Sequence, residues 1–159
     1  MPVSLRSACV DDAGEISRLT GHLGYEVSPA DVSARLSRML GREDQQFLVA
    51  ELDGRPVGWI HVSVAEYLET GAFAAVNGLV VDRDVRSRGV GQLLLERAEE
   101  WARDRDVPLI RLWSTTSREG AHRFYERQGY MKIKTQYAFV KSLRPGQNDF
   151  GSLIPRVKP

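Results

Sequence analysis

The sequence contains very little cysteine and histidine. Cys9 is the only cysteine in 159 residues, and there are three histidines. A single cysteine excludes an intrachain disulfide and a cysteine metal cluster. The His, Asp and Glu residues also lack the spacing that is typical of metal ligands, so we predict no metal. At the end of an apolar stretch, Cys9 is expected to be a small core residue rather than an acyl-carrying nucleophile.

Long apolar runs and an excess of charge of one sign are missing as well. No run approaches the roughly 18 residues that a membrane-spanning helix needs, and the first residues lack the apolar region of a signal peptide. The chain has 22 basic and 21 acidic residues, a formal net charge of +1. This balance gives no global field that favours nucleic acid or an anionic membrane. We therefore expect a cytoplasmic protein that binds neither nucleic acid nor a membrane.

What the chain does contain is typical of one folded domain. Hydrophobic residues make up 42% and charged residues 27% of its composition. Domains commonly have about 100 to 150 residues, which matches this length. From residue 144 on, proline and glycine recur and periodicity is lost. We predict a single domain over residues 1–143 and a loosely ordered tail over residues 144–159.

Apolar periodicity predicts strands and helices in the order β-α-α-β-β-β-α-β-α-β. Asp11 or Asp12 is placed to cap the first helix, and Ser28-Pro29 is typical of the start of the second. Asp53-Gly54 is typical of a hairpin turn. The predicted strands cover about residues 3–8, 47–52, 56–65, 73–82, 109–113 and 131–140, the last as a strand or hairpin. The predicted helices cover about residues 12–21, 28–41, 89–104 and 121–128.

The strongest indication of function is an arginine-rich turn with two glycines, between an apolar strand and a helix. Gly89 and Gly91 let another molecule approach the main chain, and N–H groups of the turn and the helix start converge there. Arg86 and Arg88 offer paired donors to phosphate oxygens. The turn is neither a P-loop, because no lysine follows Gly91, nor a dinucleotide fingerprint, because Leu94 replaces the third glycine. It predicts a phosphate or pyrophosphate site.

Two motifs stand in a fixed order. Arg86-Ser87-Arg88-Gly89-Val90-Gly91 has the pattern Arg/Gln-x-x-Gly-x-Gly/Ala between a strand and a long helix. About thirty residues downstream, residues 121–130 have the pattern Ala-x-x-Phe/Leu-Tyr-x-x-x-Gly-Phe/Tyr. With both motifs the chain resembles the GNAT superfamily of acyl-CoA-dependent N-acyltransferases. The resemblance implies an α/β (α+β mixed) fold, in which a central, mostly antiparallel sheet is flanked by helices.

The resemblance also implies acetyl-CoA as cosubstrate. In the family the glycine turn holds the pyrophosphate of coenzyme A, and the acyl-CoA lies along the preceding strand. A backbone N–H near Val81 would then face the thioester carbonyl, where a fixed donor in a dry site stabilises an oxyanion. The cofactor-binding residues implied are Leu79, Val80, Val81, Arg86, Ser87, Arg88, Gly89, Val90, Gly91 and Gln92.

The tyrosine of the second motif maps onto Tyr125. In the family this tyrosine stands near the sulfur and acts as general acid. Its unperturbed pKa of about 10 lies above the roughly 8.5 of a thiol, so it can protonate a departing thiolate. The alternative is that Tyr125 is only a packed ring beside Phe124. Arg118 departs from the family pattern, since an asparagine that contacts the cofactor often stands there.

The strand glutamate that many family members use as general base is missing. Asn77 and Gly78 occupy its place, and an amide can orient a water but does not accept a proton at neutral pH. Our hypothesis is that an ordered water held by Asn77 takes the proton from the amine. Glu66, Glu69 and His61 are the alternative bases.

The resemblance implies an N-acetyltransferase that acts on a primary amine by direct attack in a ternary complex. In the family, the acceptor pocket is built from the first two helices and the strand connections. Here these segments place carboxylates beside aromatic residues, which would suit a small cationic amine such as a polyamine-like or aminoglycoside-like molecule. An acidic, solvated rim explains the same residues equally well. The residues concerned are His22, Tyr25, Glu26, Asp31, Glu66, Tyr67 and Glu69.

Other functions and assemblies stay open. The missing strand carboxylate also fits a non-catalytic sensor of acyl-CoA or another metabolite. A third alternative is an acetyltransferase for protein N-termini or lysines. Family members often form dimers through C-terminal strands, so the apolar run 137–140 indicates a homodimer, although it suits an internal core equally well.

Overall fold

The protein, described by a computed structural model over residues 2–147 and 149–154, is built on one five-stranded sheet. Four neighbouring strands run antiparallel: β1 (Ser4–Ser7), β2 (Gln45–Leu52), β3 (Arg55–Tyr67) and β4 (Gly71–Val81). The fifth, β5 (Ile110–Leu112), pairs parallel to β4 at the edge of the sheet. This mixed, mostly antiparallel sheet confirms the predicted fold class.

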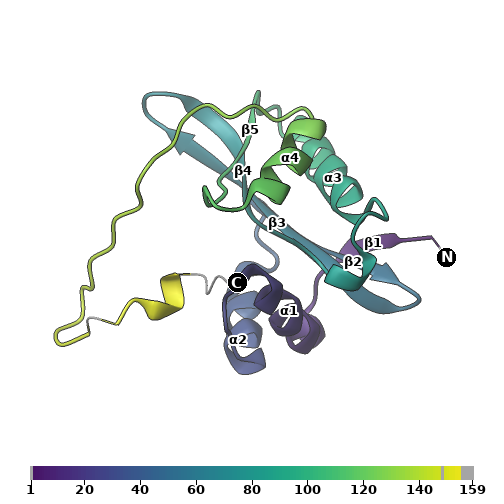
Figure 1. Ribbon diagram of the computed structural model, residues 1–159, viewed down its shortest axis with the longest axis horizontal. Coiled ribbons are helices and arrows are strands. Elements are labelled where there is room, and N and C mark those ends of the chain that lie inside the picture. Colours follow the sequence, from purple (N-terminus) through teal and green to yellow (C-terminus); the bar gives the residue numbers. More distant parts are fainter. Residues whose placement is uncertain (1, 148, 155–159) are drawn as a thin grey trace.

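Helices cover both faces of the sheet (Figure 1). On one face lie α1 (Ala13–Thr20) and α2 (Pro29–Met39), and on the other lie α3 (Val90–Asp104) and α4 (Glu119–Arg127). Because side chains alternate along a strand, β3 supplies both cores. Its Ile60 and Val62 pack with Leu94 of α3, whereas Trp59 packs with Leu19 of α1.

Local sequence patterns account for the ends of these elements. The Ser28 hydroxyl accepts a hydrogen bond of 3.1 Å from the Asp31 N–H, which caps α2 as predicted. Asp53 and Gly54 have φ of 53° and 75°, the left-handed pair that a two-residue hairpin between β2 and β3 requires. The helices and the first five strands lie within a few residues of their predicted positions.

The last predicted strand is wrong. Residues 131–140 belong to no strand or helix, and every one of them is exposed. They leave α4 as an extended chain that runs away from the sheet (Figure 1). The β propensity of this run is high, but a strand forms only when another strand supplies hydrogen-bond partners, and the run pairs with none in the part of the chain described here.

Two further local predictions are also wrong. Cys9 is exposed rather than part of the core, since the chain leaves the sheet after Ser7 and turns at Val10–Asp12. Asp12 precedes α1 but does not cap it. Its carboxylate instead accepts hydrogen bonds of 2.7 and 2.8 Å from Arg6 and one of 2.8 Å from the Cys9 N–H.

The tail predicted over residues 144–159 is described in part. It contains a short 3₁₀ turn at Gly151–Leu153, while residues 148 and 155–159 lie outside the described residues. The boundary at residue 143 stays a prediction. Among the described residues, none of the helices has both the length and the apolar character to cross a membrane.

Candidate active site

A cleft opens where β4 and β5 separate. β5 pairs with β4 only between Ala74–Val76 and Ile110–Leu112, and β4 then continues alone to Val81. The cleft holds a cavity of about 140 Å³. Four segments line it: the α1–α2 loop, the middle of β4, the end of β5 with the chain after it, and α4 with the residue before it. Their cavity-lining residues are Leu23, Tyr25, Val76, Asn77, Gly78, Leu79, Leu112, Trp113, Ser114, Thr115, Arg118 and Tyr125.

Unpaired backbone N–H groups of β4 face this cleft. The Asp82 N–H donates to the Val57 carbonyl on β3 at 2.8 Å. Because N–H groups alternate sides along a strand, those of Leu79 and Val81 point away from β3, toward the open edge. Neither has a hydrogen-bond partner among the described residues. Two fixed donors are therefore available to a carbonyl or amide oxygen in the cleft.

Asn77 occupies a bulge in β4. His61 pairs with Gly78 and Val62 pairs with Val76, so Asn77 is the extra residue. Its Nδ2 donates to the Ser63 hydroxyl at 2.8 Å, which leaves its Oδ1 without a partner among the described residues. The bulge aims an amide at the cleft, where Oδ1 can accept a hydrogen bond from a water or an amine.

The residue after Asn77 is Gly78, and packing explains why this position carries no side chain. A Cβ built on Gly78 would lie 2.6 Å from the ring of Trp59, which packs over the strand. Since that ring is part of the core against α1 and α2, only glycine fits here. The absence of a carboxylate at this point of β4 therefore has a packing reason.

Tyr125 lies on α4 and lines the cleft. Burial raises the pKa of its phenol, and the nearby positive charge of Arg118 offsets part of that rise. The group is therefore protonated at neutral pH. Its ring packs against Phe124 at 5.3 Å between centroids, and its hydroxyl has no hydrogen bond to a described residue. The ring is packed beside Phe124, as the alternative interpretation of Tyr125 predicts, while its hydroxyl is free to donate a hydrogen bond or a proton.

The glycine turn opens α3. Gly89 is the N-cap with φ 78°, and Ser87 also has a left-handed φ of 68°. Gly91 serves packing, since a Cβ there would lie 3.1 Å from the ring of Phe124. Val90 is buried in the core, so only its backbone can face an anion. Gln92 is exposed and donates to Glu96 at 2.8 Å.

Arginines gather around the turn without acidic partners. Arg83, Arg86, Arg88 and Arg118 are exposed, and none forms an ion pair or a side-chain hydrogen bond within the described residues. Partial burial, together with the positive charges of Arg83 and Arg118, lowers the pKa of Arg86. This concentration of unpaired cations favours an anion. Arg118 also lines the cleft, so it links the turn to Tyr125.

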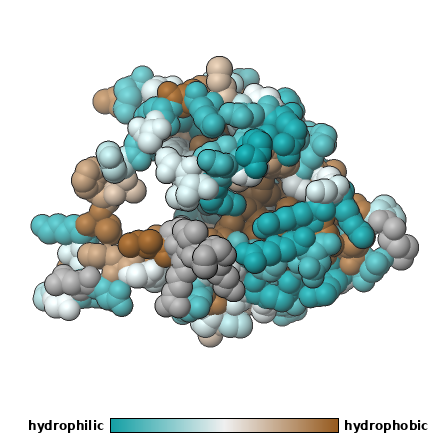
Figure 2. All heavy atoms as spheres, in the orientation of Figure 1, coloured by the Kyte–Doolittle hydropathy of each residue, from teal (hydrophilic) through white to brown (hydrophobic). Residues whose placement is uncertain are grey.

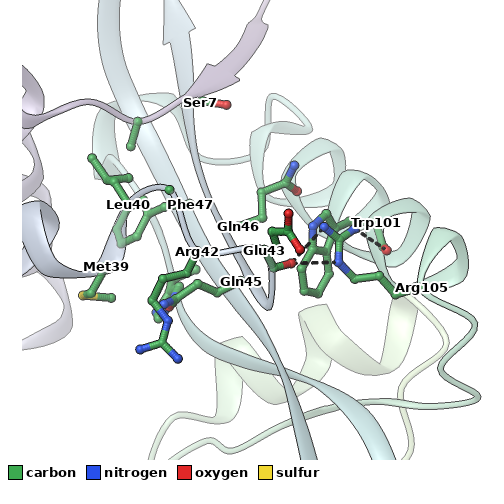
Figure 3. A pocket seen from close by; sticks show the side chains of 13 residues that line it. Ser7, Met39, Leu40, Arg42, Glu43, Gln45, Gln46, Phe47, Trp101 and Arg105 are labelled. Carbon is green, nitrogen blue, oxygen red and sulfur yellow. Dashed lines mark hydrogen bonds between the residues drawn. The ribbon is translucent and has the colours of Figure 1, made fainter.

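The alternative bases lie elsewhere. Glu66 and Glu69 are exposed near the β3–β4 turn, outside the residues that line the cleft. His61 lines a separate hollow of about 420 Å³ between the ends of α2 and α3 and the start of β2 (Figure 3). Its Nε2 lies 2.6 Å from the Gln45 side-chain oxygen, and burial lowers the pKa of its imidazole.

The sequence therefore anticipated only part of the cleft. Of the predicted acceptor residues Tyr25 lines it, whereas His22, Glu26, Asp31 and Tyr67 do not. Val80, one of the predicted cofactor-binding residues, has its side chain in the core between the sheet and α1 and α2, beside Trp59. Sequence reasoning missed Trp113 and Ser114, whose hydroxyl is buried without a hydrogen-bond partner. The available indication was their position, since Trp113 ends the predicted strand at 109–113 and Ser114 follows it directly.

Both motifs lie inside one recognised family region. The sequence pattern described as the acetyltransferase (GNAT) family matches residues 14–130, which contain the glycine turn, the bulge and Tyr125. The chain belongs to the acetyltransferase (GNAT) family. Membership confirms the predicted enzyme class, an acyl-CoA-dependent N-acetyltransferase. No group of three or more His, Cys, Asp or Glu in residues 2–147 and 149–154 is placed to hold a metal ion.

Individual GNAT relatives differ in how much they share with this chain. An uncharacterised N-acetyltransferase of Methanocaldococcus jannaschii is 32% identical over 67% of this chain, but the match spans only 48% of that protein. The aminoalkylphosphonate N-acetyltransferase of Salmonella typhimurium is 29% identical over 90% of this chain and 94% of its own length. An aminoglycoside N-acetyltransferase solved in complex with CoA has a TM-score of 0.78 at 15% identity, covering 88% of this chain and 95% of that one.

Proposed function

We propose that this GNAT protein transfers an acetyl group from acetyl-CoA to a primary amine of a small molecule, by direct attack in a ternary complex. The observation that carries the proposal is the pair of unpaired N–H groups of Leu79 and Val81 at the open edge of β4. The two relatives named for aminoalkylphosphonate and aminoglycoside substrates support a small-molecule acceptor.

The turn at the start of α3 binds the pyrophosphate. Backbone N–H groups around Gly89 and Gly91 and the side chains of Arg86 and Arg88 supply the donors, with Ser87, Val90 and Gln92 completing the turn. The unpaired arginines support this role, since they leave the local charge positive. The pantetheine then runs along Leu79, Val80 and Val81, with its amide and thioester oxygens toward the open edge.

Acyl transfer needs a donor to the oxyanion, an acceptor for the proton of the amine and a proton donor for the thiolate, and the protein supplies a group for each. The N–H of Val81 stabilises the oxyanion of the tetrahedral intermediate. Asn77 Oδ1 holds the water that takes the proton from the amine and passes it to solvent. The amine nitrogen attacks the thioester carbon to form the tetrahedral intermediate, which then collapses as the C–S bond breaks. Tyr125 gives its proton to the departing thiolate, and its raised pKa keeps that proton in place until then.

Replacing Tyr125 by phenylalanine tests the mechanism. Thiol release with acetyl-CoA and a panel of amines should lose about 100-fold in kcat, while the calorimetric Kd for acetyl-CoA stays within about twofold. Tyr137→Phe is the matched control, because Tyr137 is 90% exposed and is not among the residues that line the cleft. If Tyr125→Phe turns over like the wild type, Tyr125 is not the acid.

A second candidate function is a non-catalytic sensor of acyl-CoA or another metabolite. The specific observation that favours it is Asn77, which stands where many family members have a carboxylate. A sensor binds acetyl-CoA but has no turnover to lose. Wild-type protein that binds acetyl-CoA and acetylates no amine would favour it. A protein N-terminal or lysine acetyltransferase would instead modify peptides and leave small amines untouched.

We also propose a homodimer formed through residues 131–140, which include the apolar run 137–140. These residues pair with no strand among the described residues, and apolar side chains lie exposed along this segment (Figure 2). The exposed fractions of Ile133, Tyr137 and Phe139 are 69%, 90% and 95%. Such apolar exposure along a chain with free backbone groups favours strand pairing with a second copy. Sedimentation should give a dimer, and a Tyr137→Ser, Phe139→Ser double variant should be monomeric. A cytoplasmic location stays the expectation from the sequence.

A further inference from the structure

The guanidinium of Arg111 on β5 lies among three aromatic rings. Its Cζ is 4.6 Å from the ring centroid of Phe73, 5.4 Å from that of Trp113 and 5.5 Å from that of Tyr67. Rings at these distances attract a cation through their π faces, and they restrict where the long side chain can go. The rings hold the Arg111 cation at one place on the sheet.

This place lies next to the cleft, although Arg111 itself is not among the residues that line the cavity. Arg111 pairs with Ala75 of β4, which pairs with Ser63 of β3. Residues in one row of a sheet point to the same face, so Arg111 shares a face with Ser63, the partner of Asn77. Trp113 touches both regions, since it lines the cleft and packs against Arg111.

Arg111 differs from the other partly buried arginines. Among the described residues, three arginines are half-buried: Arg6, Arg18 and Arg111. Arg6 pairs with the buried Asp12 and Arg18 with the buried Asp82, both at 2.7 Å. The Arg111 side chain has neither an ion pair nor a hydrogen bond within residues 2–147 and 149–154. Its aromatic neighbours accept no strong hydrogen bonds, so the N–H groups of its guanidinium are available to bind an anion.

The geometry points to an acceptor that carries both a primary amine and an anionic group, a carboxylate or a phosphonate. We infer that Arg111 binds the anionic group, while Asn77 and the bulge of β4 receive the amine. The inference rests on the proposed function and replaces the cationic acceptor that the sequence favoured. Glu66 and Glu69, which suggested that cationic acceptor, do not line the cleft.

Matched amines test this inference on the whole 159-residue chain. The panel pairs 2-aminoethylphosphonate and β-alanine with propylamine, which lacks the anion, and with 1,4-diaminobutane, which replaces it by a cation. Wild-type kcat/KM for the anionic amines should exceed that for propylamine by about tenfold or more, the range expected for hydrogen bonds to a charged group.

Arg111→Gln should bring this ratio close to one, mainly through a higher KM for the anionic amines. Its turnover of propylamine and its Kd for acetyl-CoA should stay within about twofold. Arg111→Lys keeps the charge but not the fork of donors, and should keep part of the preference. Arg35→Gln is the matched control, because Arg35 is an exposed arginine on α2, away from the cleft lining. Thermal denaturation checks that every variant is folded.

Failures of the two proposals are distinguishable. Equal kcat/KM for anionic and neutral amines in the wild type refutes the role of Arg111 and leaves the acetyltransferase proposal intact. So does a preference that Arg111→Gln and Arg111→Lys both retain in full. If the wild type binds acetyl-CoA but acetylates no amine of the panel, the proposed function itself fails, and the acceptor role of Arg111 fails with it.

Discussion

Replacing Gly89 by alanine tests the glycine turn most directly. Gly89 has φ +78°, and no atom lies within 4 Å of the position that a Cβ would take. The substitution therefore meets no steric clash, and its cost comes from the left-handed backbone alone, about 1 to 2 kcal/mol. In a domain of this size such a cost lowers Tm by roughly 2 to 8 °C.

Gly54 provides a matched control. It has φ +75° and equally open surroundings, but it lies in the hairpin turn between β2 and β3. Gly54→Ala should lose about as much stability as Gly89→Ala. Only Gly89→Ala places a Cβ beside the N–H groups at the start of α3. It should weaken acetyl-CoA binding by about tenfold or more, the loss expected when a phosphate oxygen is held off a backbone donor.

Two measurements on three proteins decide the matter. Thermal denaturation followed by circular dichroism gives the stability of the wild type, Gly89→Ala and Gly54→Ala. Calorimetric titration with acetyl-CoA and with CoA gives their affinities. Unchanged affinity in Gly89→Ala would refute the turn as the pyrophosphate site. An equal loss of affinity in both variants would also refute it, because the loss would then follow stability rather than position.

Three other substitutions address the cleft and the core. Asn77→Ala should lower kcat and alter the pH-rate profile measured with a preferred amine, and an unchanged profile and turnover would contradict the water held by Asn77. The Arg6 guanidinium lowers the pKa of Asp12, so the stability from this pair is complete above the unfolded-state pKa of about 3.9 and is lost as pH falls through the lower folded pKa. Asp12→Asn should cost roughly 2 to 3 kcal/mol at pH 7 in urea unfolding and much less in strong acid, whereas an equal cost at both pH values would be inconsistent with the ion pair. Gly78→Ala should cost about 1 to 3 kcal/mol and change tryptophan fluorescence, since its Cβ would lie 2.6 Å from the Trp59 ring, and wild-type stability would contradict that packing.

Most of the helices and strands could be predicted from the sequence. The Ser28-Pro29 start of α2, the Asp53-Gly54 hairpin and the glycine turn before α3 each depend on residues within a few positions of one another. The predicted strand at 131–140 fails for the opposite reason. Its apolar residues favour a strand, yet strand formation depends on a partner that its own residues do not supply.

The candidate site divides in the same way. Tyr125 and the turn residues were predicted because two motifs carry them, and Asn77 was singled out because a carboxylate is missing. The sequence did not predict that Asn77 occupies a bulge, which depends on the register between β3 and β4. It also gave no indication that Glu66 and Glu69 lie outside the cleft.

Short-range patterns of glycine, arginine and apolar residues were enough to identify the family, the order of most elements and the glycine turn before α3. Only the tertiary structure shows which backbone donors stay unpaired and which of the half-buried arginines lacks an acidic partner among the described residues. The N–H groups of Leu79 and Val81 are free because β5 ends its pairing at Val76. Arg111 meets Tyr67 because parallel pairing joins strands that lie far apart in the chain. Such contacts depend on register and strand order, which no local pattern specifies.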